Sequence, residues 1–409
     1  HSLRRRQRQM CIRDRYNVNM RIGIFGGSFD PVHIEHVRLA EAAVESLALD
    51  ALLIMPAHTP PHKTDKALSS DGDRLEMCRL AFEGCKKTQV SDYEMRAGGT
   101  SFTYLTCRHF RKLYPEAKLY WLVGTDMLRD FPSWKNPEEI LSLATLAVCA
   151  RNEPVALPEK EAEEFYARFC ARFEVIAYRG GDVSSTRIRA LAAAGEDISS
   201  FAGKRVAAYV ADNGLYKIPH AKEALDLEKP SRRAHSVRVA VLAAERAAGL
   251  KIDEKRALTA ALFHDCAKNL PSDSPRLEGF TPPSGVPAAV VHQYAGAYVA
   301  EHAFGISDGE ILDAIRYHTS GRENMSLLGK LIFLADMLES GRDFEGVEEL
   351  RAAFWKDKDS LDECLYLALS HMLNYLADEG KEAYPLTRKA YEFIEKEIRN
   401  KTERRTNNV

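Results

Sequence analysis

The sequence lacks the features that mark secreted, membrane-spanning and nucleic-acid-binding proteins. No apolar run approaches the roughly 18 residues of a membrane span, and no secretory hydrophobic segment is present. The 57 basic and 59 acidic residues leave a net charge of −2, which argues against a broad nucleic-acid surface. The eight cysteines form no CxxC pair and are scattered, which is typical of reduced thiols in a cytosol. We therefore expect a cytoplasmic protein with no nucleic-acid or membrane partner.

Length and composition indicate two folded domains. The chain has 409 residues, 45% of them apolar and 28% charged, and about 150–200 residues per domain is usual for such a globular composition. Residues 1–19 contain six arginines, almost no apolar periodicity and a single acidic residue, Asp14. We interpret them as a non-native or disordered leader or a mis-called start before Met20, with an organelle transit peptide as the alternative, and exclude them from the fold. Residues 398–409 are expected to form a polar tail.

Residues 20–217 alternate between short apolar runs and helical patterns. The strand candidates are Ile22–Phe25, Ala51–Met55, Lys118–Val123, Ala144–Ala150 and Phe173–Ala177. The helix candidates are Val37–Leu47, Arg74–Cys85, Thr103–Tyr114, Glu159–Ala171 and Thr186–Ala193. This alternation predicts an α/β doubly wound parallel sheet with helices on both faces. Such sheets bind ligands outside the carboxyl ends of their strands, so the loops there are the first places to look for a site.

The second half of the chain has no strand pattern. Residues 218–228 form a predicted linker, flanked by Pro219 and Pro230. Apolar recurrence at three and four residues then predicts an all-α domain over residues 229–397. The predicted helices are Ser231–Ala248, Glu254–Lys268, Ala288–Phe304, Asp308–His318, Leu327–Glu339, Ser360–Glu379 and Ala390–Asn400.

The first candidate site is the segment GGSFDPVHIEH, from Gly26 to His36. Glycines let the backbone approach a ligand, and a helix N-terminus offers free N–H groups and a positive dipole to phosphate. His33 and His36 share the first helical turn, where two imidazoles can bond phosphates and stabilise a leaving pyrophosphate. A metal pair, or a structural turn with incidental histidines, is the alternative for an HxxH motif alone. The preceding strand and GGSFDP favour the nucleotide site.

This segment resembles the nucleotidylyltransferase superfamily, whose members carry a (His/Thr)xGH motif after the first strand. Other stretches, in family order over nearly all of residues 20–217, narrow the resemblance to nicotinate-nucleotide adenylyltransferases. They are MPAHTPPHK at Met55–Lys63, DRLEMCRLAF at Asp73–Phe82, GGTSFTYLT at Gly98–Thr106, LVGTD at Leu122–Asp126, Trp134, and VSSTRIR at Val183–Arg189. One departure is visible, because Glu35 stands where the family usually has glycine. We expect its carboxylate to point away from the triphosphate.

The resemblance implies the residues of this site. His33, His36 and Arg189 would be catalytic, with the Arg189 guanidinium meeting the ATP phosphates. The implied ATP- and substrate-binding residues are Gly26, Gly27, Ser28, Phe29, His62, Lys63, Thr103, Gly124, Asp126, Trp134, Ser184, Ser185 and Thr186. The hydroxyls of Ser184 to Thr186 would take phosphate oxygens, Asp126 the ribose, Trp134 the pyridine ring and Thr103 its carboxylate. An ordinary helix cap, core packing of Trp134 and a solvated loop at His62 and Lys63 are the alternatives.

The implied reaction is adenylyl transfer in NAD biosynthesis. The 5′-phosphate of nicotinate mononucleotide would attack the α-phosphorus of ATP and release pyrophosphate, with Mg²⁺ shielding the triphosphate. Another adenylyl- or cytidylyltransferase substrate is the alternative. The sequence leaves the preference between nicotinate and nicotinamide open.

The second candidate site is a series of histidines and aspartates across the helical half. Imidazole and carboxylate ligands suit iron, manganese, zinc or a similar divalent ion, and six of them can hold two metals with an aspartate bridging. The six candidate metal ligands are His235, His264, Asp265, His292, His318 and Asp336. Lys268 lies four residues after His264, on the same helical face, so it can reach the scissile phosphate. Each histidine alone is more often a packed or surface residue; the ordered series is what favours a metal site.

This series resembles the HD superfamily of metal-dependent phosphohydrolases. The phrases HSVRVA, FHDCAKNL, HTSG and IFLADMLESGRDF are similar to the subgroup that hydrolyses diadenosine tetraphosphate (Ap4A) symmetrically to two ADP. The resemblance covers about residues 229–395 and implies the six ligands, with Asp265 and Lys268 also catalytic. It adds Thr319 and Arg342 as phosphate contacts.

The sequence therefore predicts a bifunctional enzyme with ATP, nicotinate mononucleotide and Ap4A as small-molecule partners. One alternative makes the helical domain a nucleotide sensor or scaffold for the first domain. Another keeps the hydrolytic chemistry but changes the substrate to a guanosine alarmone or another nucleotide. The sequence leaves open whether the chain forms a homo-oligomer.

Overall fold

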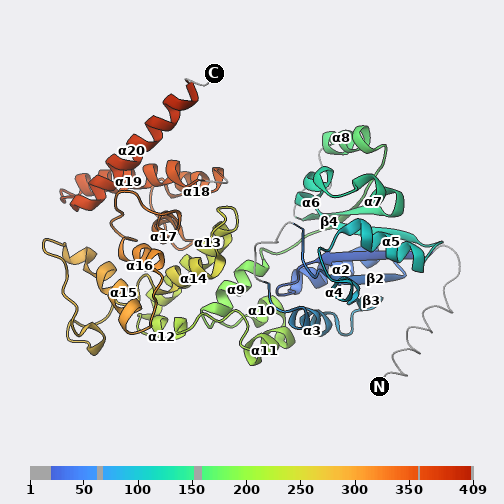
Figure 1. Ribbon diagram of the computed structural model, residues 1–409, viewed down its shortest axis with the longest axis horizontal. Helices are drawn as coiled ribbons and strands as arrows, with labels where there is room; N and C mark the ends of the chain where they lie inside the picture. Colours follow the sequence, from blue (N-terminus) through green and yellow to red (C-terminus); the bar gives the residue numbers. More distant parts are fainter. Residues whose placement is uncertain (1–19, 62–67, 152–158, 358–359, 407–409) are drawn as a thin grey trace. The chain divides into compact units, whose positions relative to one another are not determined.

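The computed structural model of the chain describes residues 20–61, 68–151, 159–357 and 360–406. The chain divides into two compact units, which are described separately here. The first combines His1–Ser185 with Ile198–Asn213, and the second combines Thr186–Asp197 with Gly214–Val409. Figure 1 shows the sheet in the blue and green part of the chain and helices throughout its yellow and red part.

The first unit is built on a six-stranded parallel sheet with the order β3-β2-β1-β4-β5-β6. The strands are β1 (Arg21–Gly27), β2 (Ala51–Pro56), β3 (Thr88–Val90), β4 (Lys118–Gly124), β5 (Thr145–Arg151) and β6 (Glu174–Tyr178). The central strands are buried on both faces, which is why they appear in the sequence as continuous apolar runs rather than as alternating ones. The predicted doubly wound fold is confirmed.

Helices connect these parallel strands. They are α2 (Ile34–Ser46), α3 (Asp71–Phe82), α4 (Tyr93–Ala97), α5 (Thr103–Leu113), α6 (Thr125–Asp130), α7 (Pro137–Leu143) and α8 (Glu159–Phe169). After β6, α9 (Ser185–Ala193) lies almost entirely in the second unit, and α10 (Ser199–Ala202) and α11 (Lys204–Asp212) return to the first. Strand order reverses between β1 and β4, because the chain builds β2 and β3 on one side and β5 and β6 on the other. A doubly wound sheet opens its ligand crevice at this reversal, so the loops after β1 and β4 lie where a nucleotide is expected.

Several elements of the first unit are shorter than sequence periodicity can reveal. Strand β3 has three residues at the sheet edge, and α4, α6 and α10 are single turns or little more. Such segments are too short to repeat an apolar pattern, and tertiary contacts decide their conformation.

The described part of the second unit is helical, as predicted. Its helices are α12 (Ala221–Leu225), α13 (Pro230–Ala247), α14 (Glu254–Phe263), α15 (Val291–His302), α16 (Gly309–Arg316), α17 (Leu327–Leu338), α18 (Val347–Lys356), α19 (Asp362–Asp378) and α20 (Pro385–Thr406). Helices α12 and α18 were not predicted. Helix α14 also ends at Phe263, earlier than the predicted Lys268, and a series of turns follows it. His264 and Lys268 therefore do not share a helical face, and the prediction that they do is wrong.

Small residues bring the helices of the second unit close together. Ala243 and Ala247 of α13 and Ala257 and Ala261 of α14 are completely buried in one core where these helices pack. In α15, a Cβ atom on Gly296 would lie only 3.0 Å from the backbone oxygen of His264, so glycine allows α15 to approach the end of α14. Because backbone atoms cannot move aside as a flexible side chain can, this glycine helps to position His264 and Asp265.

Two general predictions can be compared with the structure. The cysteines within the described residues are all free thiols, and Cys11 lies outside those residues. Within the same part of the chain, no helix combines the length and the apolar character needed to cross a bilayer.

Candidate functional site

The two histidines of the first motif lie together at the start of α2. Their rings stack with centroids 3.7 Å apart and planes inclined by 27°. The backbone N–H of His33 donates to Nδ1 of His36 across 3.2 Å. A neutral imidazole has one protonated nitrogen, so accepting at Nδ1 places the His36 proton on Nε2, where it can be donated to an anion. Phe29 packs edge-on against His36 at 5.0 Å and fixes the ring.

Gly26 and Gly27 are the last two residues of β1, and the structure gives both a packing role. A Cβ on Gly26 would lie 2.9 Å from the ring of the buried Trp121, and one on Gly27 would lie 3.1 Å from the Phe29 ring. Both glycines therefore make room for aromatic rings beneath the loop. The approach of a ligand to the backbone of these glycines stays a prediction.

A buried arginine that was not assigned a role joins two loops of this unit. Arg74 is 1% exposed and donates to the backbone oxygens of Ser28, Ala57 and His58 at 3.0, 2.5 and 3.2 Å. Asp71 accepts from the same guanidinium at 2.6 Å and compensates its charge. Ser28 belongs to the loop after β1, and Ala57 and His58 follow β2, so Arg74 holds both loops in place. The quoted stretch DRLEM contained this residue, but burial of an arginine has no periodic signal.

The β6–α9 loop meets the loop after β1. Ser185 donates through Oγ to the backbone oxygen of Pro31 at 2.9 Å. Ser184 is half-buried immediately before α9, which begins at Ser185. Glu35 is buried and bonds to Tyr178 and Gly181 on the same side of the sheet. The structure thus brings the HxxH turn and the hydroxyl-rich loop together.

The other predicted residues of this site are placed less closely. Asp126 is exposed beyond the carboxyl end of β4 and lies against Gly124, and Thr103 is half-buried in the first turn of α5. Trp134 is half-buried with its ring 5.3 Å from that of Phe131, in accordance with the core-packing alternative. His62 and Lys63 lie outside the described residues.

Arg189 makes a contact that the sequence did not indicate. Its Nε and Nη2 atoms donate to the two carboxylate oxygens of Glu254 at 2.6 Å each. Nη2 also lies 3.0 Å from Oγ1 of Thr186. All three residues belong to the second compact unit. The role of Arg189 toward the ATP phosphates stays a prediction.

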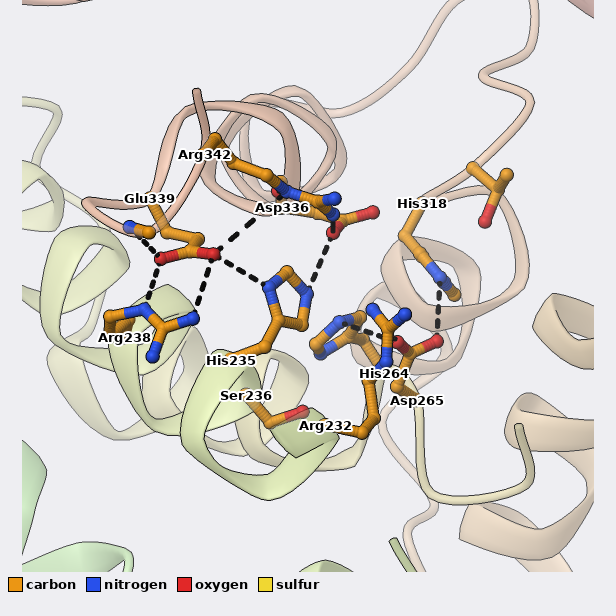
Figure 2. Close-up of polar contacts among 12 residues, drawn as sticks. Arg232, His235, Ser236, Arg238, His264, Asp265, His318, Asp336, Glu339 and Arg342 are labelled. Carbon is orange, nitrogen blue, oxygen red and sulfur yellow. Dashed lines mark hydrogen bonds and ion pairs between the residues drawn. The ribbon is translucent and has the colours of Figure 1, made fainter. Parts of the chain in front are cut away.

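The six predicted metal ligands converge in the second unit, and five of them are labelled in Figure 2. Asp336 Oδ1 lies 2.9 Å from His235 Nε2. Asp265 is completely buried at the centre, with Oδ2 at 3.5 Å from His264 Nε2. Its other oxygen, Oδ1, lies 3.3 Å from His318 Nε2 and 3.5 Å from His292 Nε2. The carboxylate of Asp265 thus faces different imidazoles with its two oxygens.

The backbone orients these imidazoles with one nitrogen toward the centre. His264 Nδ1 bonds to the backbone oxygen of Ala261 at 2.7 Å, and His318 Nδ1 bonds to that of Ile315 at 2.8 Å. A carbonyl only accepts, so each Nδ1 carries the proton and each Nε2 presents a lone pair. Two overlapping groups, His235–His264–Asp336 and His264–Asp265–His318, have donor atoms within 4.8 Å of one another.

Unsatisfied polar atoms indicate that this cage fits a cation. His264 Nε2 and both carboxylate oxygens of Asp265 are buried and make no hydrogen bond to any residue that the structure describes, although Arg232 Nη1 forms an ion pair with Asp265 Oδ2 at 3.0 Å. Buried polar atoms without hydrogen bonds are costly unless a ligand or ion satisfies them. Nitrogen and carboxylate donors of this kind suit a transition-metal ion.

The electrostatics of the cage favour the metal-binding protonation states. Burial lowers the pKa of His264 to about 4 and that of His292 to about 3, with His318 and Lys268 contributing at His292, so both imidazoles are neutral at pH 7. Burial would raise the pKa of Asp265, but His264 and His318 outweigh it and hold that pKa well below its usual range. The site therefore presents lone pairs and a carboxylate together.

The predicted phosphate contacts surround the same centre. Lys268 Nζ lies 3.2 Å from His292 Nε2 and 3.5 Å from Asp265 Oδ1, reached through the turns after α14. Thr319 Oγ1 lies 2.9 Å from His292 Nε2. Arg342 donates to the backbone oxygen and to Oδ1 of Asp336 at 2.9 and 2.7 Å, so its guanidinium contacts a ligand residue.

Two residues at this site were missed. Glu339 is 1% exposed, and its Oε1 accepts from His235 Nδ1 at 3.0 Å while Gly341 N–H and Arg238 donate to it (Figure 2). Arg232 lies one turn before His235, with Nη1 3.0 Å from Asp265 Oδ2. The sequence offered a signal for Arg232, because a residue three before a ligand shares its helix face. It offered none for Glu339, whose position depends on where α17 ends.

Comparison with known proteins gives matches to both halves. The family described as cytidylyltransferase-like matches residues 24–191, and the HD domain family matches residues 232–341. A Mycoplasma genitalium protein named "Probable nicotinate-nucleotide adenylyltransferase/Ap4A hydrolase" is 29% identical over 93% of this chain and 100% of its own length. A Mycoplasma pneumoniae protein of the same name is 31% identical over 79% of this chain and 89% of its own length. A Gemmatimonas aurantiaca protein named "Probable nicotinate-nucleotide adenylyltransferase" is 37% identical over 52% of this chain and 100% of its own length.

Proposed function

The chain belongs to the family of two-domain proteins named nicotinate-nucleotide adenylyltransferase/Ap4A hydrolase in Mycoplasma, and from this premise we propose that it is a bifunctional enzyme. The first domain transfers AMP from ATP to nicotinate mononucleotide and releases pyrophosphate. The second hydrolyses Ap4A symmetrically to two ADP. The convergence of His33, His36 and the β6–α9 loop supports the first activity. The convergence of the six ligand residues, with Asp265 among them at the centre, supports the second.

In the first domain the protein acts through position and charge. His36 can donate from Nε2 to a phosphate oxygen, and the N–H groups at the start of α9 with the hydroxyl of Ser184 can take others. Ser185 would contribute through its backbone N–H, because its hydroxyl donates to Pro31. Asp126, beyond the end of β4, is assigned to the ribose, and Thr103 and Trp134 to the pyridine nucleotide. Arg189 and Thr186 keep their predicted assignment to the ATP phosphates. Mg²⁺ would accompany ATP and shield its charge.

In the second domain we assign His235, His264, Asp265, His292, His318 and Asp336 to two divalent metals, iron or manganese among them. When bound, these ions supply Lewis acidity toward water and phosphoryl oxygens. The protein orients His235, His264 and His318 by their Nδ1 bonds. It also excludes water, since Asp265, His264 and His318 are at most 1% exposed. Lys268 is placed to neutralise developing charge on the phosphate, with Thr319 and Arg342 at the rim.

Steady-state kinetics with ATP and either nicotinate or nicotinamide mononucleotide test the first activity. We expect pyrophosphate release with the nicotinate substrate. Thr103→Ala and Trp134→Ala should raise KM for the pyridine nucleotide more than KM for ATP, because Trp134 is assigned to the pyridine ring and Thr103 to its carboxylate. Equal effects on the two substrates would contradict this assignment and favour another nucleotidylyl acceptor.

Metal analysis combined with product analysis on Ap4A tests the second activity. The expected products are two ADP, and Asp265→Asn should remove both metal and activity. ATP plus AMP would contradict symmetrical cleavage. A chain that binds metal and Ap4A without turnover would support the sensor alternative, and turnover of a guanosine polyphosphate in place of Ap4A would change the substrate assignment.

A further inference from the structure

Glu35 is a buried carboxylate in the middle of the HxxH turn, at a position where the resembled adenylyltransferases usually have glycine. It is the second residue of α2, and it is 4% exposed. A carboxylate in the first turn of a helix is stabilised by the positive end of the helix dipole. Burial opposes its ionisation, but hydrogen bonds from Tyr178, Gly181 and Arg38 outweigh burial and lower the pKa of Glu35. Glu35 is therefore an anion at neutral pH, with its charge compensated inside the protein.

The contacts of Glu35 connect two segments that are far apart in the sequence. Oε2 accepts from the backbone N–H of Gly181 at 2.7 Å and from the hydroxyl of Tyr178. Tyr178 is the last residue of β6, and Gly181 lies in the loop that leads to α9. Oε1 accepts from Arg38 at 2.7 Å, on the outer side, where the Arg38 side chain is 59% exposed. The carboxylate thus uses one oxygen for the loop and the other for a surface arginine.

A second contact joins the same two segments. Ser185 Oγ donates to the backbone oxygen of Pro31, just before the histidines. The β6–α9 loop is therefore attached to the HxxH segment at both of its ends, near Tyr178 through Glu35 and near Ser185 through Pro31. A Cβ on Gly181 would lie 3.2 Å from Glu35 Oε1, so glycine at 181 admits this close approach.

We propose that Glu35 is a positioning residue that fixes the β6–α9 loop against the first turn of α2. The loop then presents Ser184, Ser185 and the N-terminal N–H groups of α9 in a fixed place for the phosphates of ATP. Glycine at position 35 provides no acceptor, so Gly181 N–H and the Tyr178 hydroxyl would have to find another partner. Preorganised donors need no rearrangement when charge arrives, which is why fixing the loop favours nucleotide binding. The assignment of this loop to ATP rests on the proposed adenylyl transfer.

Hydrogen–deuterium exchange on the substrate-free full chain tests the attachment itself. With Glu35→Gly we expect amide exchange over residues 179–185 to become at least about tenfold faster, with other segments unchanged. Glu35→Gln should give an intermediate rate, because its amide oxygen can still accept from Gly181 N–H. Tyr178→Phe should shift the loop in the same direction as Glu35→Gly. Arg38→Ala is the matched control, since Arg38 contacts Glu35 and not the loop, and its exchange should match the unsubstituted protein.

Kinetics test the consequence for the nucleotide. Glu35→Gly should raise KM for ATP about tenfold, and KM for nicotinate mononucleotide by less than about twofold, while Arg38→Ala leaves both nearly unchanged. Unchanged loop exchange in Glu35→Gly, or in Glu35→Gln if the glycine variant does not fold, would overturn the proposal. Equal KM changes for the two substrates would also overturn it. If the unsubstituted chain does not transfer adenylyl groups, the proposed function fails, and the exchange experiment still decides whether Glu35 fixes the loop.

Discussion

Replacement of Glu339 tests whether a carboxylate behind a ligand controls metal binding at the helical site. Glu339 is buried, and its Oε1 accepts from Nδ1 of His235 at 3.0 Å, while Nε2 of the same ring faces Asp336 at 2.9 Å. The carboxylate fixes the tautomer and ring orientation and makes Nε2 more basic. Gly341 N–H donates to it at 2.6 Å, so it cannot easily rotate away. Glu339→Gln keeps the shape but removes the charge.

The expected magnitude follows from what each substitution leaves behind. Loss of such an outer partner typically weakens metal affinity by about 10- to 100-fold, or about 1.4–2.8 kcal/mol. Glu339→Gln should lie near the lower value, because its amide oxygen can still accept from Nδ1–H. Glu339→Ala should lie near the upper value, because His235 then loses its partner and Arg238 loses the buried end of its ion pair.

Titration of the metal-free chain with Mn²⁺ by calorimetry, or by competition with a chelator, measures the dissociation constants. Glu348→Gln is the matched control, since Glu348 also pairs with an arginine, Arg351, but its side chain is 76% exposed. Its metal affinity should equal that of the unsubstituted chain. The reasoning is refuted if Glu339→Gln folds and binds Mn²⁺ as tightly as the unsubstituted protein, or if the control weakens binding equally.

Three further predictions concern other buried or convergent charges. Lys268→Ala should lower kcat for Ap4A hydrolysis by about 100-fold with metal content unchanged, because the Lys268 ammonium lies beside His292 and Asp265. As the control, Lys255→Ala, which changes an exposed lysine of α14, should retain activity. Loss of metal in Lys268→Ala would contradict a role toward phosphate. Arg74→Leu should lower the free energy of unfolding by about 3–5 kcal/mol in denaturant titration, because it leaves buried carbonyl groups unpaired. As the control, Arg79→Leu on the exposed face of α3 should lower it by less than about 1 kcal/mol. Similar losses of stability in the two variants would refute the role of Arg74 in holding the loops. Burial raises the pKa of Glu94 above its ordinary 4.5, even though Thr106 and Ser101 donate to it. The folded state therefore binds the proton more tightly than the unfolded state does. The free energy of unfolding should fall as pH rises from 4.5 through the folded pKa. In denaturant titrations at several pH values, Glu94→Gln should remove this fall in the free energy of unfolding. Glu116→Gln, which changes an exposed glutamate, should keep it. An unchanged pH dependence in Glu94→Gln would show that Glu94 does not titrate in this range.

Local chemistry determined which segments of the chain could be predicted from sequence. Long buried strands such as β4 and amphipathic helices such as α16 repeat their apolar residues often enough to be recognised, and turn residues mark their ends. The spacing of His33 and His36 is a local signal of the same kind. The histidines and aspartates of the helical half are far apart in the sequence, and their order was informative because it resembles the HD superfamily. The local signals depend on neighbours in the sequence, so they require no knowledge of the fold.

Only the tertiary structure could determine the partners that come from distant segments. Arg74 bonds to the loops after β1 and β2, Glu35 to the loop after β6, and Glu339 to a histidine on another helix. Helix α14 ends at Phe263, and His264 and Lys268 lie in the turns that follow, where Gly296 of α15 comes close to the His264 backbone. Such contacts depend on which elements pack together and at what distance, and a buried charge or a close backbone approach leaves no periodic mark in the sequence.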